Sequence, residues 1–484
     1  MRVPCRRPVM LLLAAVLAAL AWPAVAPAQG SPPSLRLVAP AGPVTLHRFR
    51  KQVFLDLPVW VAATGGDFEL RVARPDYESP AGLDQVDAAT GDVLRDLPDD
   101  MLDGWFGMSR FVRVIFRDET GDRIARRWFT FCPNGFERQR VDDSGPELPS
   151  YPGFCGSFSP FTKGMVWGIE SGWATSALGG GDFGAPSLRL RKTGRFSVEV
   201  RIARPYADLF EIPAEDARVT MDVTVKDARR GGCCIEGPAR ARAAAPVQSL
   251  GVPDVTDPDP STVPDLVALP LWALDTFHRR GRDFLGFAAT PWNAGPAPLV
   301  IEGFRRPGET VMDAYQYFRD ADGDVVGRAE AGTMAFHSHP RHNHWHFLQF
   351  AAFTLHDASD LEVVRSRKQA FCLAPTDAID LTIERASFSP WEGVSTNCGS
   401  SGALWVREVL QTGWADTYFQ GIPGQSFNIT GLPNGWYYAR MEVNPLGTIH
   451  EVTTANNVES RLLHLGGRPG RRTALVTPWH GIED

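Results

Sequence analysis

Half of the residues in one short stretch of this chain are histidines, and their spacing fits a metal site. The stretch HSHPRHNHWH, residues 337–346, contains five of the eleven histidines in the 484-residue sequence. If the backbone is extended, alternate side chains lie on one face, so His342, His344 and His346 would point the same way. Three imidazoles on one face are a typical ligand set for a transition metal. We therefore expect this trio to bind a metal ion.

The two earlier histidines of the stretch are expected to play a different part. On a single strand, His337 and His339 have the opposite parity to the trio. Pro340, which separates this pair from the trio, interrupts ladder pairing. We expect them to be structural or to lie beside the ligands. With no cysteine or carboxylate in the run, the ligand set suits copper, zinc, nickel or iron.

The first residues of the chain predict export. Residues 1–28 contain three arginines, then an apolar run, then small residues, which is the pattern of a secretory signal peptide. No later stretch is long and apolar enough to predict a membrane span. We expect a secreted, extracellular protein, and this location favours copper or zinc among the four metals.

Cysteines and charge narrow the class further. Six cysteines remain after the leader, and an even number in an oxidising compartment predicts disulfides. Proximity in sequence suggests pairing Cys132 with Cys155 and Cys372 with Cys398, which leaves the adjacent Cys233 and Cys234 without an assigned partner. The net charge of −7 is dispersed and argues against a nucleic-acid partner.

Lysine is scarce, and the position of one lysine is informative. The chain has five lysines among 49 basic residues, and only Lys368 follows Lys226. Where charge alone is needed, this chain uses arginine.

The rest of the sequence predicts an all-β protein. Alternating strands bounded by Gly, Pro and Asp turns dominate, and helical periodicity is scarce after the leader. We expect a β-sandwich domain at residues 263–484, preceded by one or two immunoglobulin-like β-sandwich modules at 31–140 and 150–234. Residues 235–262 are rich in Ala, Arg, Pro, Asp and Ser, which is typical of a linker.

Five segments of the C-terminal domain, in order, resemble the lysyl oxidase family. The segments are VPDL (263–266), HNHWHF (342–347), RKQAFCL (367–373), WADTYFQG (414–421) and VNPLGTIHEVTTANN (443–457). Trp345 stands where the family's copper motif has tyrosine. The resemblance covers only the C-terminal domain, and it implies a β-sandwich catalytic domain.

The resemblance implies a function and two cofactors. His342, His344 and His346 would hold copper, and Lys368 and Tyr418 would be the catalytic pair that forms lysine tyrosylquinone. The implied activity is oxidative deamination of primary amines, including protein lysine side chains, to aldehydes. Dioxygen would reoxidise the cofactor, with release of hydrogen peroxide and ammonia.

The resemblance also implies a calcium site. This site would use Asp265, the Leu266 carbonyl, Glu451, Asn456 and Asn457.

Thr453 stands where the family has an aspartate among those calcium ligands.

For the general base, the region after the copper motif departs from the family pattern, and Asp416 and His356 are the candidates.

Two other classes of protein remain open from the sequence. One is a non-catalytic extracellular metal-binding or cell-surface interaction protein with a structural metal. The other is a metal-dependent oxygenase on a β-sandwich. Only the amine oxidase requires Lys368 and Tyr418 to be linked.

Overall fold

The computed structural model describes most of the chain after the leader. The described ranges are 32–135, 137–143, 145–178, 186–227, 251–305, 310–339, 342–368, 370–391, 398–422 and 424–483, with only the backbone described at 338, 339, 342 and 343. The leader 1–28, linker residues 235–250, Cys233 and Cys234 lie outside them. No helix in these ranges is long and apolar enough to cross a membrane.

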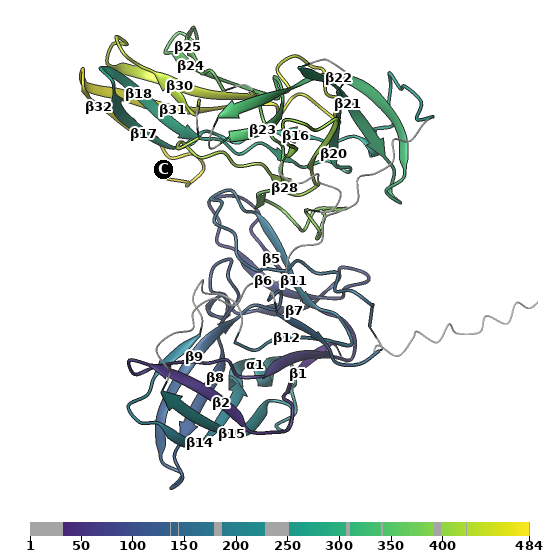
Figure 1. Cartoon of the computed structure of the whole chain (residues 1–484), viewed down its shortest axis with the longest axis vertical. Coiled ribbons are helices and arrows are strands. Elements are labelled where there is room, and N and C mark those ends of the chain that lie inside the picture. Colours follow the sequence, from purple (N-terminus) through teal and green to yellow (C-terminus); the bar gives the residue numbers. More distant parts are fainter. Residues whose placement is uncertain are drawn as a thin grey trace, which may run out of the picture.

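Almost all regular secondary structure in the described residues is β-strand, which confirms the all-β prediction (Figure 1). It contains one short α-helix, α1 (Arg204–Leu209), and two 3-10 turns, η1 (Asp99–Met101) and η2 (Pro260–Thr262). Several strands alternate strictly between buried and solvent-facing residues, as the period of two in their sequences requires.

Three sheets form the N-terminal unit. The first contains β1 (Ser34–Val38), β4 (Trp60–Thr64), β12 (Trp173–Ser176) and β10 (Arg138–Arg140). The second contains β11 (Gly164–Ile169), β5 (Phe68–Ala73), β6 (Gly82–Val86) and β7 (Val93–Leu97). The third contains β13 (Ser187–Arg189), β3 (Gln52–Phe54), β2 (Val44–Phe49), β15 (Arg218–Asp227), β14 (Gly194–Ile202), β8 (Met108–Arg117) and β9 (Arg123–Phe131).

Each of these sheets combines strands from both ranges that the sequence assigns to modules. For example, β5 of the first range pairs with β11 of the second. The ranges 31–140 and 150–234 therefore interleave, and separate immunoglobulin-like modules are not confirmed.

Four sheets form the C-terminal unit, all in antiparallel pairs. The first contains β16 (Leu266–Val267), β19 (Trp292–Asn293), β28 (Trp414–Ala415) and β26 (Asp377–Ala378), and the second contains β17 (Trp272–Arg279), β18 (Arg282–Ala288) and β29 (Ser426–Asn428). The third contains β23 (His342–Phe347), β22 (Val325–His339), β21 (Val311–Arg319), β20 (Leu299–Arg305) and β27 (Trp405–Leu410). The fourth contains β25 (Glu362–Arg365), β24 (Ala351–Asp357), β30 (Gly435–Val443), β31 (Val458–Arg468) and β32 (Arg471–Val476). The ring of Phe287 stacks on Phe427 and makes a tilted contact with Phe353, which joins β18 to β29 and β24 in the core.

The C-terminal unit begins inside the expected linker. The Asp254 backbone bridges Arg328 of β22, and Val255 packs against buried Val263 and Phe318. Residues 251–262 are therefore folded onto the domain that follows them.

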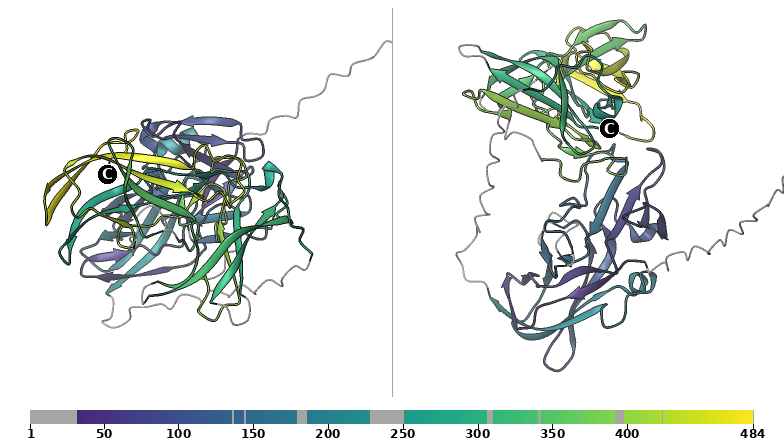
Figure 2. Two further views of the ribbon diagram at one scale, coloured as in Figure 1. Left: turned by 90° about the horizontal axis from the view of Figure 1, so that it is seen from above. Right: turned by 90° about the vertical axis from the view of Figure 1, so that its right-hand side faces the viewer.

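The two units meet where β11 begins (Figures 1 and 2). The Lys163 N–H donates to the Ile379 carbonyl at 2.6 Å, and the Leu381 N–H donates to the Gly164 carbonyl at 2.9 Å. A Cβ at position 164 would collide with the Asp380 side chain, which explains the glycine. An apolar cluster around Phe161, Trp292 and Ile482 seals this joint.

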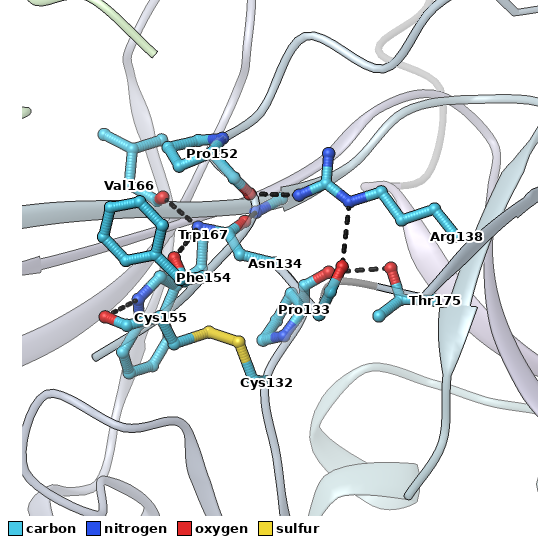
Figure 3. Close-up of a disulfide and its surroundings, with 12 residues drawn as sticks. Cys132, Pro133, Asn134, Arg138, Pro152, Phe154, Cys155, Val166, Trp167 and Thr175 are labelled. Atoms are coloured by element: carbon cyan, nitrogen blue, oxygen red, sulfur yellow. Dashed lines mark hydrogen bonds between the residues drawn. A yellow bond between two sulfur atoms is a disulfide. The ribbon is translucent and has the colours of Figure 1, made fainter. Parts of the chain in front are cut away.

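Both disulfides expected from proximity are present. Cys132 bonds Cys155 and Cys372 bonds Cys398, at Cα separations of 5.7 and 5.9 Å. The first lies in the N-terminal unit (Figure 3). Beside it, the Asn134 amide donates to the carbonyls of Phe154 and Val166, so this loop is held from two sides.

Candidate functional site

The histidine-rich stretch is a β-hairpin, which changes how its side chains are arranged. Strands β22 and β23 pair antiparallel, with His337 opposite His344 and His339 opposite His342. Directly opposite residues in an antiparallel pair lie on the same face. His337 therefore lies on the same face as His344 and His346, and its expected opposite parity is wrong, because residues 337 and 344 belong to two paired strands and not to a single one. The side chain of His339 lies outside the described residues.

Described ring contacts support this grouping. The ring centroids of His344 and His346 are 4.7 Å apart, and those of His337 and His346 are 5.6 Å apart. The His342 side chain lies outside the described residues, so the full trio is not seen together. Among the side chains that are described, no group of three His, Cys, Asp or Glu residues meets the geometry of a metal site.

The opposite face of the hairpin packs into the core. Trp345 is fully buried, contacts Phe336 at 5.6 Å, and donates its indole N–H to the Ser400 carbonyl. Tryptophan at this position therefore anchors the strand and leaves the imidazole face clear of it.

The electrostatics favour neutral imidazole, the form that binds metals. Burial, and then the nearby positive charge of Lys368, lower the pKa of His344. A neutral ring keeps a lone pair for a metal ion. The donor set therefore fits copper, whose preferred ligands include imidazole.

Lys368 and Tyr418 lie against each other although fifty positions separate them in the chain. The Lys368 Nζ is 4.2 Å from the centroid of the Tyr418 ring and 4.9 Å from that of Phe371. Both residues are buried, at 6% and 7% exposure. Gly424 allows this approach, because a Cβ there would lie 3.1 Å from the Lys368 Cβ.

Backbone contacts fix the tyrosine from both ends. Its phenol oxygen accepts the Cys372 N–H and donates to the Cys372 carbonyl, both at 3.0 Å. Its own backbone exchanges two hydrogen bonds with Ala289. Phe371 in turn bridges Phe347, the residue after His346. The histidine hairpin, the lysine segment and the tyrosine therefore belong to one hydrogen-bonded array.

Two buried carboxylates accompany Lys368. Burial raises the pKa of Asp416 and of Glu408 well above their ordinary values, and interaction with Lys368 opposes both shifts. One oxygen of each, Asp416 Oδ2 and Glu408 Oε1, has no hydrogen-bond partner among the described residues. Burial also lowers the pKa of Lys368 to about 8, against the opposing attraction of the two carboxylates.

Sequence reasoning missed Glu408, although the pattern of its strand indicates burial. Its strand reads WVREVL, and Glu408 has the same parity as the buried Val406 and Leu410. A glutamate on the inward face of an amphipathic strand requires a partner inside the protein. Here the Leu373 N–H donates to it at 2.9 Å.

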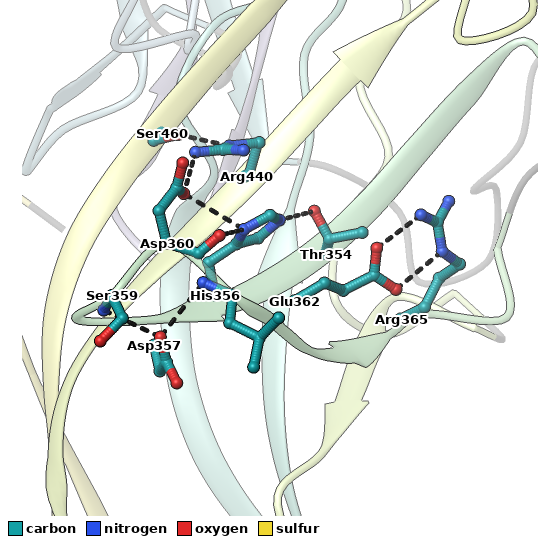
Figure 4. Close-up of polar contacts among 10 residues, drawn as sticks. Thr354, His356, Asp357, Ser359, Asp360, Glu362, Arg365, Arg440 and Ser460 are labelled. Carbon is teal, nitrogen blue, oxygen red and sulfur yellow. Dashed lines mark hydrogen bonds and ion pairs between the residues drawn. The ribbon is translucent and has the colours of Figure 1, made fainter.

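The other candidate base, His356, is engaged elsewhere (Figure 4). Its Nε2 lies 3.0 Å from Thr354 Oγ1, and its Nδ1 lies 3.1 Å from the Asp360 carbonyl. The Asp360 carboxylate also pairs with Arg440. With both ring nitrogens held in this network, His356 has a structural role on β24.

The residues of the expected calcium site come together from distant segments. Glu451 accepts the Leu266 N–H and the amide groups of Asn444 and Asn457. The Asn456 amide donates to Asp265 at 3.1 Å.

Two amide oxygens of this site, Asn456 Oδ1 and Asn457 Oδ1, are buried without a partner among the described residues. Amide oxygens and carboxylates gathered in one place are the ligands that a hard cation such as calcium prefers. Thr453 is exposed and accepts the Ala455 N–H, so it closes a local turn.

A comparison with known protein families finds a match within the C-terminal unit. The family model described as Lysyl oxidase matches residues 322–470, from the turn before β22 through β31 to the turn before β32. The match covers under a third of the chain and is consistent with a lysyl oxidase family domain at its C-terminal end. No curated protein matches the chain.

Proposed function

We propose that the C-terminal unit, which matches the lysyl oxidase family over residues 322–470, is a copper-dependent amine oxidase. It would convert primary amines, including lysine side chains of proteins, to aldehydes with release of hydrogen peroxide and ammonia. The observation that carries this proposal is the contact of Lys368 with the ring of Tyr418. The expected leader would export the protein, so the reaction would take place outside the cell.

In this proposal His342, His344 and His346 hold copper. With copper and dioxygen, the family's lysine tyrosylquinone forms from one lysine and one tyrosine and supplies the electron sink for amine oxidation. The fit rests on the lowered pKa of His344, which favours its neutral form, and on the contact of its ring with that of His346.

The chain's own residues prepare Lys368 for bond formation. An amine whose pKa is about 8 is partly unprotonated near neutral pH, and only the unprotonated amine is a nucleophile. Burial between Phe371 and Tyr418 limits the positions that the amine can take. The phenol is held by Cys372, so the two reacting groups meet in a fixed geometry.

Asp416 is the better of the two candidate bases. It lies two residues before Tyr418, is fully buried, and interacts electrostatically with Lys368. A carboxyl whose pKa is raised towards the working pH can both take and return a proton. Both ring nitrogens of His356 are engaged by Thr354 and Asp360, which leaves neither for this role.

Calcium would have a structural role. Asp265, the Leu266 carbonyl, Glu451, Asn456 and Asn457 would tie the start of the domain to the segment before β31. The two partnerless amide oxygens support this assignment.

A non-catalytic metal-binding protein accounts less well for these residues. Such a protein has no need to bury Lys368 against Tyr418, because burial of an amine costs desolvation free energy.

The test is quinone staining of protein expressed with copper. Staining should appear in the parent protein and be lost in Lys368→Arg. It should persist in Lys192→Arg, a control at an exposed lysine. Staining that survives in Lys368→Arg would overturn the proposal.

A further inference from the structure

The largest sheet of the N-terminal unit has a basic solvent-facing side. Its strands β2, β14 and β15 lie at the end of the molecule away from the C-terminal unit (Figures 1 and 2). Apolar residues of β14 and β15 alternate into the core, and polar residues point the other way. The basic residues on this side, which define the basic face, include Arg113, Arg126, Arg195, Arg201, Arg218 and Lys226.

Positive charge is in excess on the basic face. Among the described strand residues of this side, the acidic ones are Glu199 and Asp222. The chain as a whole carries a net charge of −7. The excess is therefore a local feature of this sheet and points to an anionic partner.

Three arginines of the basic face lie directly opposite one another on adjacent strands. Arg201 of β14 is opposite Arg218 of β15 on one side and Arg113 of β8 on the other. Trp128 of β9 continues this row, and the Arg113 guanidinium lies 5.2 Å from its ring centroid. Like charges directly opposite each other in a sheet are destabilising. A bound anion would relieve this repulsion.

Neighbouring residues leave the row able to bind an external anion. Glu199 is 3.9 Å from Arg201, which is too far for a hydrogen bond. The Nε of Arg113 is buried and has no hydrogen-bond partner among the described residues. Burial, and then the positive charges of Arg201 and Arg126, lower the pKa of Arg113. The row therefore keeps both uncompensated charge and an unused donor.

Aromatic side chains reach solvent at one edge of the same face. The strand register places Phe49 of β2 and Phe54 of β3 on this side, and they are 52% and 49% exposed. Between them the chain turns at Arg50 and Lys51, whose φ values are 53° and 88°. Such a two-residue turn favours Asn-Gly, because other residues are strained there. The chain thus keeps two cations at the tip of the hairpin, next to two exposed rings, despite this strain.

Shape and chemistry together favour a bilayer over an acidic polymer as the partner. The sheet has seven strands. With strands about 4.8 Å apart, the face is about 30 Å wide, and a bilayer surface can meet all of it at once. Guanidinium groups bind phosphate oxygens bidentately, and phenylalanine gains free energy by leaving water for the lipid interface. An acidic polymer would use the charges and gain little from Phe49 and Phe54.

We propose that the basic face docks this protein on the surface of an anionic phospholipid bilayer. Attraction between basic residues and anionic lipids, combined with burial of apolar side chains, gives peripheral binding without a membrane span. The C-terminal unit lies at the other end of the molecule (Figure 1), so docking keeps it away from the lipid. The inference goes beyond the proposed amine oxidase function and does not depend on it.

Co-sedimentation with lipid vesicles tests the bilayer. The full chain is mixed with vesicles of equal parts phosphatidylglycerol and phosphatidylcholine, and with pure phosphatidylcholine vesicles as the neutral control. We expect binding to the anionic vesicles alone, and release by sodium chloride at about 0.5 M. Arg201→Gln with Arg218→Gln should bind about tenfold more weakly.

The matched control is Arg279→Gln with Arg282→Gln, which removes an exposed pair of opposite arginines from β17 and β18 of the C-terminal unit and should bind like the parent. A second variant separates lipid from polymer. Phe49→Ser with Phe54→Ser should also bind the anionic vesicles about tenfold more weakly, and should leave retention on immobilised poly-L-glutamate unchanged.

Three results would overturn the proposal. The first is equal vesicle binding in the parent and in Arg201→Gln with Arg218→Gln, with thermal melts showing that the variant is folded. The second is equal binding to anionic and neutral vesicles. The third is retention on poly-L-glutamate without vesicle binding, which would assign the face to an acidic polymer.

Discussion

The amine of Lys368 lies 4.2 Å from the centre of the Tyr418 ring, in a site closed to solvent. This lysine is the only one after Lys226. A chain that elsewhere uses arginine for positive charge therefore places its late lysine where a primary amine meets a phenol.

Burial of Lys368 makes stability depend on pH. Its pKa is about 8 in the folded protein and 10.5 when solvated, so between these values the unfolded chain holds a proton that the folded chain has released. The free energy of unfolding should therefore rise by about 3 kcal/mol from pH 8 to pH 10.5 through this group.

Copper-free Lys368→Met should lack this contribution, since methionine has a similar shape and no charge. Urea unfolding at several pH values measures it, and Lys192→Met should follow the parent. Equal pH dependence in parent and Lys368→Met would show that the lysine is not buried as described.

The two disulfides should differ in their effect on the cofactor. They close loops of 23 and 26 residues, so the loss of either should cost about 3–4 kcal/mol. Only Cys372 holds the Tyr418 hydroxyl through its backbone.

We expect Cys372→Ser with Cys398→Ser to lower the rate of quinone formation, followed by absorbance after copper addition. Cys132→Ser with Cys155→Ser is the matched control and should lower the melting temperature alone. Equal rates of quinone formation in the two double variants would show that the Cys372–Cys398 disulfide does not help to position Tyr418.

Calcium should stabilise the domain through Glu451 and its neighbours. At about 100 times its Kd, a ligand adds about 2.7 kcal/mol to the free energy of unfolding. We expect calcium to raise the melting temperature of the parent and not that of Glu451→Gln.

Asp322→Asn is the control for calcium, because the turn at 320–324 also carries carboxylates but closes on itself through Asp320. A calcium response lost in Asp322→Asn and kept in Glu451→Gln would place the ion in that turn.

Much of the fold could be predicted because it follows from local pattern. Period-two alternation indicates strands, and cysteines close in sequence indicate both disulfides. The pairing of β5 with β11 joins segments almost a hundred positions apart, and no local pattern specifies that partner.

The site could be predicted in part for the same reason. Alternation along β23 groups His342, His344 and His346, but the partner strand decides the face of His337. Glu408 reaches Lys368 only through tertiary structure, so its inward parity indicates burial without naming the partner.

The most direct measurement is peptide mass spectrometry of the full chain expressed with copper. The account predicts one cross-linked species that contains the peptides around Lys368 and Tyr418, with the mass of a quinone, and its absence from Lys368→Arg. Recovery of the two peptides separately and unmodified, from protein fully loaded with copper, would contradict it.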